Sequence, residues 1–419
     1  MKHMRHWLMM VALLCGLAAN AHDFEVDGIY YNIISSSDLT VGVTNRYYSE
    51  NSYSGVVIIP STVTYDKKTY RVTSIEGESF ANCTGLTSIT IPENVKDIGV
   101  YAFGGCTGLT SITIPESVKY IEDSAFSGCS SLTSITLPEG VTSIGNSAFS
   151  GCSSLVSIAI PDGVNYIGSF AFSSCSSLIS VNIPESVTYV GNGAFIGTAW
   201  YDNQPNGIVY VGKVLYAYKG TMLEYERLKI AEGTVSVSAC AFQGCYRLTS
   251  INIPASVKNI GYRVFHGCTS LNEIIIEDSN EILNFEGSEF FYNCPLKNVY
   301  LGRNLSYNSG RRFGYSPFYN RTNLESVTIG ENVTSIGDYA FRNCSNLTSI
   351  TIPNGVISIG GSAFYNCERL TSITIPQSVT LIGDYVFDNC KSLSDIRIHI
   401  VDIDSWLNNN FAGSINKSY

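Results

Sequence analysis

Cysteine is the residue type whose number and spacing in this sequence could support chemistry. Eleven of the thirteen cysteines stand three residues after a phenylalanine. A regular series of thiols could form disulfide bonds in an oxidising compartment, or it could hold a soft metal ion. The series consists of Cys83, Cys106, Cys129, Cys152, Cys175, Cys245, Cys268, Cys294, Cys344, Cys367 and Cys390.

The spacing itself favours buried thiols over bridges. If the cysteines occupy equivalent places on stacked strands, their Cβ atoms lie about 4.8 Å apart. That separation exceeds the roughly 3.5–4.5 Å that a disulfide prefers, and a free thiol packs well as a small apolar side chain. Disulfide bonds and a metal site are the alternatives. The cysteines that we assign to the core are Cys106, Cys129, Cys152, Cys344 and Cys367.

Histidine is too scarce to build an acid–base site. Nucleophilic catalysis needs a base beside the thiol or hydroxyl, and His266 stands two residues before Cys268. Because Cys268 occupies the repeated position, we predict a surface histidine and a buried thiol instead of a catalytic dyad. An H-E-x-x-H zinc motif does not occur. The sequence therefore predicts no catalytic residue, no metal site and no enzymatic activity.

One segment imitates a phosphate-binding loop. Gly207 to Lys213 fits the pattern G-x-x-x-x-G-K, but Val214 follows where such a loop requires Ser or Thr to reach magnesium. The intervening residues are strand formers, whereas a phosphate loop is a glycine-rich turn that enters a helix. We therefore predict a β-hairpin here, and we assign the Gly191-x-Gly pair to a repeated Ile-Gly turn. No cofactor is expected.

The N-terminus has the pattern of a secretory signal peptide. Lys2 and Arg5 precede an apolar run, and Ala19-Asn-Ala21 is a cleavage site, so His22 should begin the mature chain. Cys15 lies in the apolar run without the small preceding residue that lipidation requires, so we expect it to be removed with the signal. No later apolar stretch is long enough to span a membrane. We expect an exported protein at the outer cell surface or outside the cell.

The overall charge excludes two classes of partner. The formal net charge is -10, and loss of Lys2 and Arg5 with the signal makes it about -12. Nucleic acids and anionic membranes would both be repelled. Charged residues make up only 14% of the chain, while Ser, Thr, Gly, Ile and Tyr are abundant, which is typical of a β-rich chain with few long helices.

A repeat of 23 residues positions all of these features. Phenylalanines recur at this interval from Phe80 to Phe195, from Phe242 to Phe265, and from Phe318 to Phe387. A fixed period over most of a chain is the signature of a solenoid. One repeat buries too little apolar surface to offset the entropy of ordering its backbone, so neighbouring repeats must share a core. The phenylalanines that we assign to this core include Phe103, Phe126, Phe149, Phe172, Phe341 and Phe364.

The repeat resembles the BspA-type leucine-rich repeats of bacterial and protist surface proteins. Leu109, Ile112 and Ile114 form the pattern L-x-x-L-x-L, and Ile144 to Pro161 reproduces I-G-x-x-A-F-x-x-C-x-x-L-T-S-I-x-I-P almost residue for residue. The resemblance covers about residues 75 to 398. It implies a right-handed, β-rich leucine-rich-repeat solenoid with a parallel sheet on one face, short strands and turns on the other, and little α-helix.

Departures from the period predict the domain organisation. The interval from Phe195 to Phe242 is 47 residues, and residues 276–320 are irregularly spaced, so we expect the ladder to be interrupted at both places. Alternating apolar stretches in residues 22–72 predict a β-rich cap. The expected parts are a signal peptide at 1–21, an N-terminal cap at 22–72, a first solenoid block at 73–198, an inserted aromatic hairpin segment at 199–238, a second block at 239–398, and a C-terminal cap or truncated tail at 399–419.

Both interruptions are rich in the residues that dominate binding interfaces, namely Trp, Tyr and Arg. Aromatic side chains would also be needed simply to dock an inserted hairpin on its neighbours, so a structural role is the alternative. The candidate ligand-binding residues are Trp200, Tyr201, Tyr210, Tyr216, Tyr218, Tyr300, Arg303, Arg311, Arg312 and Tyr315.

The residues that flank the inward pair of each repeat strand should face solvent. They form a uniform ladder such as Ser111/Thr113, which suits β-structure and could also contact glycans or ordered water. The ladder changes character at Glu273/Ile275 and Asn298/Tyr300, where a specific contact is more plausible. We expect a non-enzymatic protein that binds host matrix or cell-surface proteins, as the resemblance implies. The alternative is glycan binding through the aromatic patches.

Overall fold

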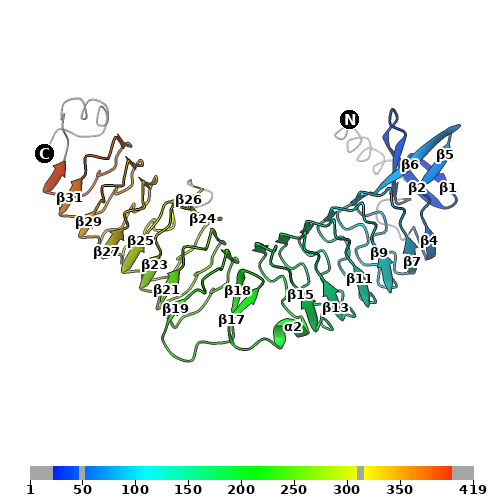
Figure 1. Ribbon diagram of the computed structural model, residues 1–419, viewed down its shortest axis with the longest axis horizontal. Coiled ribbons are helices and arrows are strands. Elements are labelled where there is room, and N and C mark those ends of the chain that lie inside the picture. Colours follow the sequence, from blue (N-terminus) through cyan, green and yellow to red (C-terminus); the bar gives the residue numbers. More distant parts are fainter. Residues whose placement is uncertain (1–21, 47–51, 309–315, 399–419) are drawn as a thin grey trace, which may run out of the picture. The chain divides into compact units, whose positions relative to one another are not determined.

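The computed structural model describes residues 22–46, 52–308 and 316–398. The chain divides into two compact units, Met1–Gln204 and Pro205–Tyr419. Each unit is a β-solenoid in which one repeat makes one turn, which we call a rung (Figure 1). The predicted signal peptide at 1–21 and the predicted tail at 399–419 lie outside the described residues.

In the first unit, a sheet of short strands lies on one side of the rungs, and three strand pairs lie on the other. The short-strand side contains β1 (Phe24–Val26), β2 (Ile29–Ser35), β3 (Thr40–Thr44), β5 (Thr62–Tyr65), β6 (Lys68–Ile75), β8 (Asp97–Ile98), β10 (Tyr120–Ile121), β12 (Ser143–Ile144), β14 (Tyr166–Ile167) and β16 (Tyr189–Val190). The pairs are β4 (Gly55–Ile58) with β7 (Leu86–Thr90), β9 (Ser111–Thr113) with β11 (Ser134–Thr136), and β13 (Ser157–Ala159) with β15 (Ser180–Asn182). The four-residue helix α2 (Ala199–Asp202) ends the unit.

The second unit repeats this plan with a continuous sheet on one side, which we call the outer sheet. It contains β19 (Glu226–Lys229), β21 (Leu248–Ile253), β23 (Glu273–Ile276), β25 (Asn298–Leu301), β27 (Ser326–Ile329), β29 (Ser349–Thr351), β31 (Ser372–Ile375) and β33 (Asp395–Ile398). The other side contains β17 (Gly207–Val211), β18 (Val214–Lys219), β20 (Ser236–Val237), β22 (Asn259–Ile260), β24 (Leu283–Phe285) and β26 (Leu305–Tyr307), and then β28 (Ser335–Ile336), β30 (Ser358–Ile359) and β32 (Leu381–Ile382).

Antiparallel strands close the N-terminal end of the first solenoid. β1, β2 and β3 pair antiparallel, and β3 then pairs parallel with β6, which leads into the ladder of short strands. Tyr53 lies under the first repeat phenylalanine, with its ring centroid 4.5 Å from that of Phe80. Its hydroxyl donates to the carbonyl of Thr44, and burial raises the pKa of Tyr53. The first phenylalanine of the stack is therefore covered by an aromatic ring.

The repeat phenylalanines stack face to face along the core of each unit. Successive ring centroids lie 5.3 Å apart from Phe103 to Phe126 and 5.4 Å apart from Phe126 to Phe149, with nearly parallel planes. These rings have no exposed surface. The backbone follows the same register, because the amide of Phe126 donates to the carbonyl of Ala148 in the next rung (2.8 Å). Each ring is therefore sealed by the rings of its two neighbours.

The cysteine thiols take part in the same ladder. Nine of the eleven repeat thiols donate to the carbonyl of the phenylalanine one rung earlier; Cys129 Sγ, for example, lies 3.1 Å from the Phe103 oxygen. Equivalent bonds of 3.0–3.3 Å are made by Cys106, Cys152, Cys175, Cys268, Cys294, Cys344, Cys367 and Cys390. All the described cysteines are free thiols. In most rungs the position three residues after the phenylalanine therefore holds a small side chain that donates one hydrogen bond.

Two residues replace cysteine at this position and still supply a donor. Thr198 is fully buried, and its hydroxyl donates to the Phe195 carbonyl (2.7 Å). Arg321 donates from Nη1 to the carbonyl of Phe291, one rung earlier. Arg321 thus replaces the cysteine donor to the preceding rung, whereas Thr198 donates within its own rung. The phenylalanine carbonyls also accept the amide three residues later, as that of Phe126 does from Cys129.

Glycine is required where the rungs approach most closely. A Cβ built on Gly191 would lie 2.3 Å from the backbone nitrogen of Ser169 in the preceding rung. The Gly191-x-Gly pair is therefore a repeated Ile-Gly-type turn, as predicted. Gly207 to Val211 forms the first strand of an antiparallel hairpin with Val214 to Lys219, so this stretch is a hairpin and not a phosphate loop.

The 47-residue interval between Phe195 and Phe242 spans the boundary between the two units. Thr198 to Gln204 belongs to the first unit, and the hairpin β17–β18 begins the second. β18 pairs parallel with β20, and the amide of Tyr218 donates to the Ala241 carbonyl (2.7 Å). Ala217-Tyr218 thus takes the place of the Ala-Phe pair, and the hairpin is a rung of the second solenoid, not a segment inserted into the ladder.

The second departure interrupts only one side of the second unit. The outer sheet runs through it without a break, because Glu273, Asn298 and Ser326 are paired in register across β23, β25 and β27. On the other side the sheet ends at β26, and a new sheet begins at β28. The expectation of an interrupted ladder was therefore wrong for the outer sheet. The extra residues are accommodated in the turns.

Removal of one stacked ring should strongly destabilise the first unit. We expect Phe149→Ala to lower the free energy of unfolding by about 3–5 kcal/mol, because it leaves a cavity between two rings that cannot close over it. Urea unfolding followed by circular dichroism measures the change. The neighbouring Ser150→Ala should change stability by less than about 0.5 kcal/mol, and equal effects of the two variants would contradict the shared core.

The buried thiols should make the protein less stable at alkaline pH. Burial raises the pKa of Cys83 and of Cys390 to about 11, whereas an unfolded thiol has a pKa of about 8.5. Above about pH 8.5 the unfolded chain loses these protons before the folded chain does, so stability declines as pH rises toward about 11. We expect urea midpoints to fall between pH 8 and pH 10. The double variant Cys83→Ser/Cys390→Ser should show a shallower decline, and an unchanged slope would refute this cause.

Candidate binding surfaces

The first two aromatic candidates serve the end of the first solenoid. Trp200 lies on α2, and its ring centroid is 5.0 Å from that of Phe195, the last phenylalanine of this stack. The hydroxyl of Thr198 accepts a hydrogen bond from the amide of Tyr201 at the start of the helix (3.0 Å). Burial raises the pKa of Tyr201, and the neighbouring Asp202 adds to the shift. Trp200 therefore packs over the last phenylalanine ring of the first unit.

The next three candidates hold the first rung of the second unit together. Tyr216 is 4% exposed, and the Tyr210 hydroxyl accepts from the amide of Ala231 (3.1 Å). The Tyr218 ring packs on that of Phe242, with centroids 6.3 Å apart. These contacts explain the aromatic content of the hairpin by packing alone.

Arg303 is not a surface residue. Its side chain has no exposed area, and Nη1 donates to the carbonyls of Ala255 and Val257, both at 2.9 Å, while Nη2 donates to that of Pro254 at 2.8 Å. Burial lowers the pKa of Arg303, and Glu277 partly opposes the shift. The expectation that Arg303 contacts a ligand is therefore corrected, because its guanidinium lies inside the fold and donates to backbone carbonyls.

Arg303 compensates for an irregular turn. In two regular rungs, a serine of the next rung donates to a turn carbonyl, as Ser186 Oγ does to that of Val164 (2.7 Å). The rung that contains residues 277–283 is longer, and Arg303 reaches across it to the turn at 254–257. Tyr300 is on the surface and is described below. Arg311, Arg312 and Tyr315 lie outside the described residues.

One end of the outer sheet carries large polar and aromatic side chains on its solvent side. We call this the charged end and define it by Arg227, Lys229, Glu273, Ile275 and Tyr300, which lie on β19, β23 and β25. Strand register aligns Arg227 with Glu273 through Ser250, and Lys229 with Ile275 through Asn252. Parallel strands about 4.8 Å apart place these side chains side by side.

Ion pairs and hydrogen bonds organise the charged end. Arg227 pairs with Glu273, which also accepts from Ser250 Oγ (2.8 Å). Lys229 Nζ lies 3.2 Å from a carboxylate oxygen of Glu277.

Tyr300 is oriented by an acidic side chain at the charged end. Its hydroxyl donates to Asp278 Oδ2 (2.8 Å), and this bond is the main cause of the raised pKa of Tyr300. Ion pairs and hydrogen bonds therefore orient Arg227, Lys229, Glu273 and Tyr300.

The same two columns contain small residues on the next three strands, β27, β29 and β31, and end in Asp395 with Arg397 on β33. On β27 and β29 they contain Ser326 with Thr328 and Ser349 with Thr351, all exposed. In the first unit, Ser111 with Thr113 on β9 is equally small. The change at Glu273/Ile275 and Asn298/Tyr300 that the sequence indicated thus coincides with one contiguous part of a sheet.

A second surface follows the turns after the repeat phenylalanines. We call it the turn ridge and define it as the residues that directly follow each repeat phenylalanine. In the first unit they are small or aliphatic: Ala81, Gly104, Ser127, Ser150, Ser173 and Ile196. In the second unit they are Gln243, His266, Tyr292, Tyr319, Arg342, Tyr365 and Asp388.

The rings of the turn ridge stack from rung to rung. The His266 and Tyr292 centroids lie 4.8 Å apart with nearly parallel planes, and the Arg342 guanidinium lies 3.9 Å from the centroid of Tyr365. Tyr292 is 49% exposed. Sequence reasoning did not assign a binding role to His266, Arg342 or Tyr365. Comparing the position after each repeat phenylalanine down the repeats would have revealed them.

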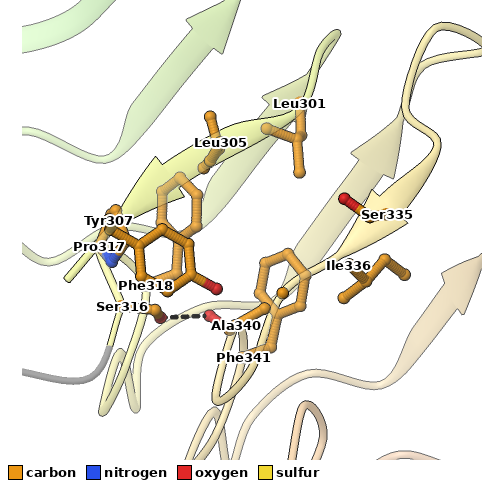
Figure 2. A pocket seen from close by; sticks show the side chains of 11 residues that line it. Leu301, Leu305, Tyr307, Ser316, Pro317, Phe318, Ser335, Ile336, Ala340 and Phe341 are labelled. Carbon is orange, nitrogen blue, oxygen red and sulfur yellow. Dashed lines mark hydrogen bonds between the residues drawn. The ribbon is translucent and has the colours of Figure 1, made fainter. Parts of the chain in front are cut away.

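One small cavity lies within the described part of the second unit. This cavity of about 20 Å³ lies where the sheet breaks between β26 and β28, and it is large enough for about one water molecule. Figure 2 shows Tyr307, Phe318 and Phe341 around it and the hydrogen bond from Ser316 Oγ to the Ala340 carbonyl (2.8 Å). Within residues 22–46, 52–308 and 316–398, no group of three or more His, Cys, Asp or Glu side chains is arranged to hold a metal ion.

His266 and Cys268 do not form a catalytic pair. The thiol donates to the Phe242 carbonyl at 3.0 Å, while the imidazole stacks on Tyr292 and lies 3.9 Å from a Glu289 carboxylate oxygen. The described part of the chain also contains no helix of the length and apolarity that crossing a bilayer would demand.

Comparison with known proteins gives one family and several related structures. The sequence matches the BspA type leucine rich repeat region, in six copies, over residues 73–200, 205–317 and 311–417. A leucine-rich repeat protein from Bacteroides ovatus is 31% identical over 94% of this chain and 99% of its own, with a TM-score of 0.41. No curated protein sequence gives a significant match.

Two other solved structures are similar over most of their lengths. A leucine rich cell surface protein from Faecalibacterium prausnitzii is 27% identical over 92% of this chain and 96% of its own, with a TM-score of 0.35. The pneumococcal vaccine antigen PcpA is 20% identical over 90% of this chain and 98% of its own, with a TM-score of 0.39.

Arg303→Met should destabilise the second unit without altering its surface. We expect the free energy of unfolding to fall by at least about 2 kcal/mol, because the carbonyls of Ala255 and Val257 lose their donor at about 1–3 kcal/mol each, while that of Pro254 keeps the Val257 amide. Urea unfolding measures the loss. Arg369→Met, at an arginine bound only to Asn346 on the surface, is the matched control, and an equal effect there would show that Arg303 is not a structural clamp.

Proposed function

The chain belongs to the BspA-type leucine-rich repeat family, and from this premise we propose that it is an exported binding protein that holds a protein partner on its charged end. The proposal extends to location: a signal peptide at 1–21 would deliver the chain to the outer cell surface or beyond. Host matrix proteins and proteins of other cells are the partners that the family suggests.

One observation carries this proposal. On the solvent side of the outer sheet, the small Ser and Thr residues of β27, β29 and β31 give way across β19–β25 to Arg227, Glu273, Ile275 and Tyr300. The far strand β33 carries only one charged pair in these columns, Asp395 with Arg397. Stability of the solenoid does not require this change, because the inward residues of these strands are as apolar as elsewhere. Arg and Tyr are the residues that contribute most binding energy in interfaces. Their presence on one contiguous part of the sheet therefore favours a contact surface.

The charged end combines an apolar centre with polar surroundings and ordered side chains, which favours binding of a protein. Ile275 supplies an apolar centre, while the ion pairs of Arg227 and Lys229 surround it with polar groups. Because the Tyr300 hydroxyl is bonded to Asp278, less side-chain entropy is lost when a partner binds. The negative net charge disfavours nucleic acid as the partner.

Glycan binding is a second candidate, and the turn ridge favours it. Exposed aromatic side chains such as Tyr292 lie on a surface where the first unit has small residues. Flat aromatic faces with a few polar groups are typical of sites for small polar ligands. The aromatic candidates of the first departure, Trp200 and Tyr218 among them, are engaged in packing and support this function less.

The charged end should be sensitive to a single misplaced charge. In binding assays of the chain against immobilised matrix proteins and mucins, we expect Ile275→Asp to weaken capture at least about tenfold, equal to roughly 1.4 kcal/mol. Thr351→Asp adds the same charge to β29 in the column that contains Ile275. Equal losses in both variants would indicate a nonspecific charge effect, and no loss in either would refute the charged end as the contact surface.

A further inference from the structure

We propose that Arg342, together with Tyr339, Tyr365 and Tyr385, forms a binding site for a sugar that carries a carboxylate, such as a uronic or sialic acid. The inference rests on the second candidate function, glycan binding, and names its ligand class and its central residue. It does not depend on protein binding at the charged end.

Arg342 differs from every other described arginine of the second unit. The remaining seven donate to a carboxylate, a backbone carbonyl or an amide oxygen of the protein, and Arg342 donates to none within the described residues. The other seven are Arg227, Arg247, Arg263, Arg303, Arg321, Arg369 and Arg397. Because no described residue accepts from this guanidinium, its five N–H groups are free of internal acceptors in that part of the chain and can serve a ligand.

Two tyrosine rings hold this guanidinium in place. Its central carbon lies 3.9 Å from the centroid of Tyr365, one rung later, and 5.6 Å from that of Tyr339 on its own rung. Stacking on these rings immobilises the guanidinium plane and leaves its N–H edge accessible. Two N–H groups on that edge can form parallel hydrogen bonds with the two oxygens of a carboxylate. The site is therefore preorganised for one carboxylate. Asp338, beside Tyr339, instead accepts from the Gly361 amide (2.7 Å).

The surroundings indicate a sugar as the bearer of that carboxylate. Tyr385 is 56% exposed and occupies the same repeat position as Tyr339, two rungs later. Aromatic faces beside a charged group suit a pyranose, which has an apolar C–H face and polar edges. The net charge of -10 disfavours a polyanion, so a ligand with an isolated carboxylate fits better than a phosphorylated or nucleic-acid chain.

The test compares two sugars that differ in one group. Isothermal titration of the full chain with methyl β-D-glucuronide and methyl β-D-glucoside should show at least tenfold tighter binding of the glucuronide. Arg342→Gln should remove that difference in affinity. Arg342→Lys should reduce it, because an ammonium group does not stack on the tyrosine rings and cannot form two parallel hydrogen bonds with a carboxylate. Arg369→Gln, one rung later, is the matched control and should bind as the parent does. Circular dichroism verifies that each variant is folded.

Each other outcome overturns a defined part of the proposal. Equal affinity for both sugars, or tighter binding of the glucoside, would refute recognition of the carboxylate. An acidic peptide that binds as tightly as the glucuronide, and that also loses affinity in Arg342→Gln, would replace the sugar by a protein ligand. A folded chain that binds no glycan on an array refutes glycan binding as a whole. Because Ile275→Asp should leave glucuronide affinity unchanged, failure here is separable from failure at the charged end.

Discussion

Contact between the repeat phenylalanines of successive rungs is the interaction on which the rest of this structure depends. A ring such as Phe126 is sealed only when Phe103 and Phe149 lie in register on either side of it. That register sets the strand pairing, brings nine of the repeat thiols to the carbonyl of the preceding phenylalanine, and requires glycine where the backbones of neighbouring rungs meet. Because every rung depends on its neighbours, the ends need aromatic covers, which Tyr53 and Trp200 provide in the first unit.

The variable positions of the core show what the register tolerates. Tyr218 takes the place of a phenylalanine, Thr198 and Arg321 take the place of cysteine, and Arg303 fills a rung whose turn is too long. Each of these residues supplies an aromatic ring or a hydrogen-bond donor at a position where the regular residue is missing. A side chain that departs from the repeat pattern can therefore have a purely structural role. An arginine in an irregular repeat does not by itself indicate a binding surface.

Binding chemistry is left to the side chains that the core does not use. The outward columns of the outer sheet and the turn ridge carry little packing, so their residues can change without loss of the solenoid. They are uniform in most rungs and distinctive in a few, and those few contain Ile275 and Tyr300 on the sheet and Arg342 and Tyr365 on the ridge. The two proposed sites are thus local departures on a regular scaffold.

The sequence alone determined the solenoid, the family resemblance and the core. The 23-residue period specifies which rings meet, because a residue that recurs in every rung must pack on its own copies. It also located the change of character at Glu273 and Tyr300, since outward positions follow from strand alternation. It could not decide the roles of Arg303, Trp200 or Arg342. Whether an arginine or tryptophan is exposed depends on turn lengths and on acceptors in other rungs, which only the folded arrangement brings together. Arg303 meets carbonyls 46 to 49 residues earlier, whereas Arg342 meets two rings and no acceptor within the described residues.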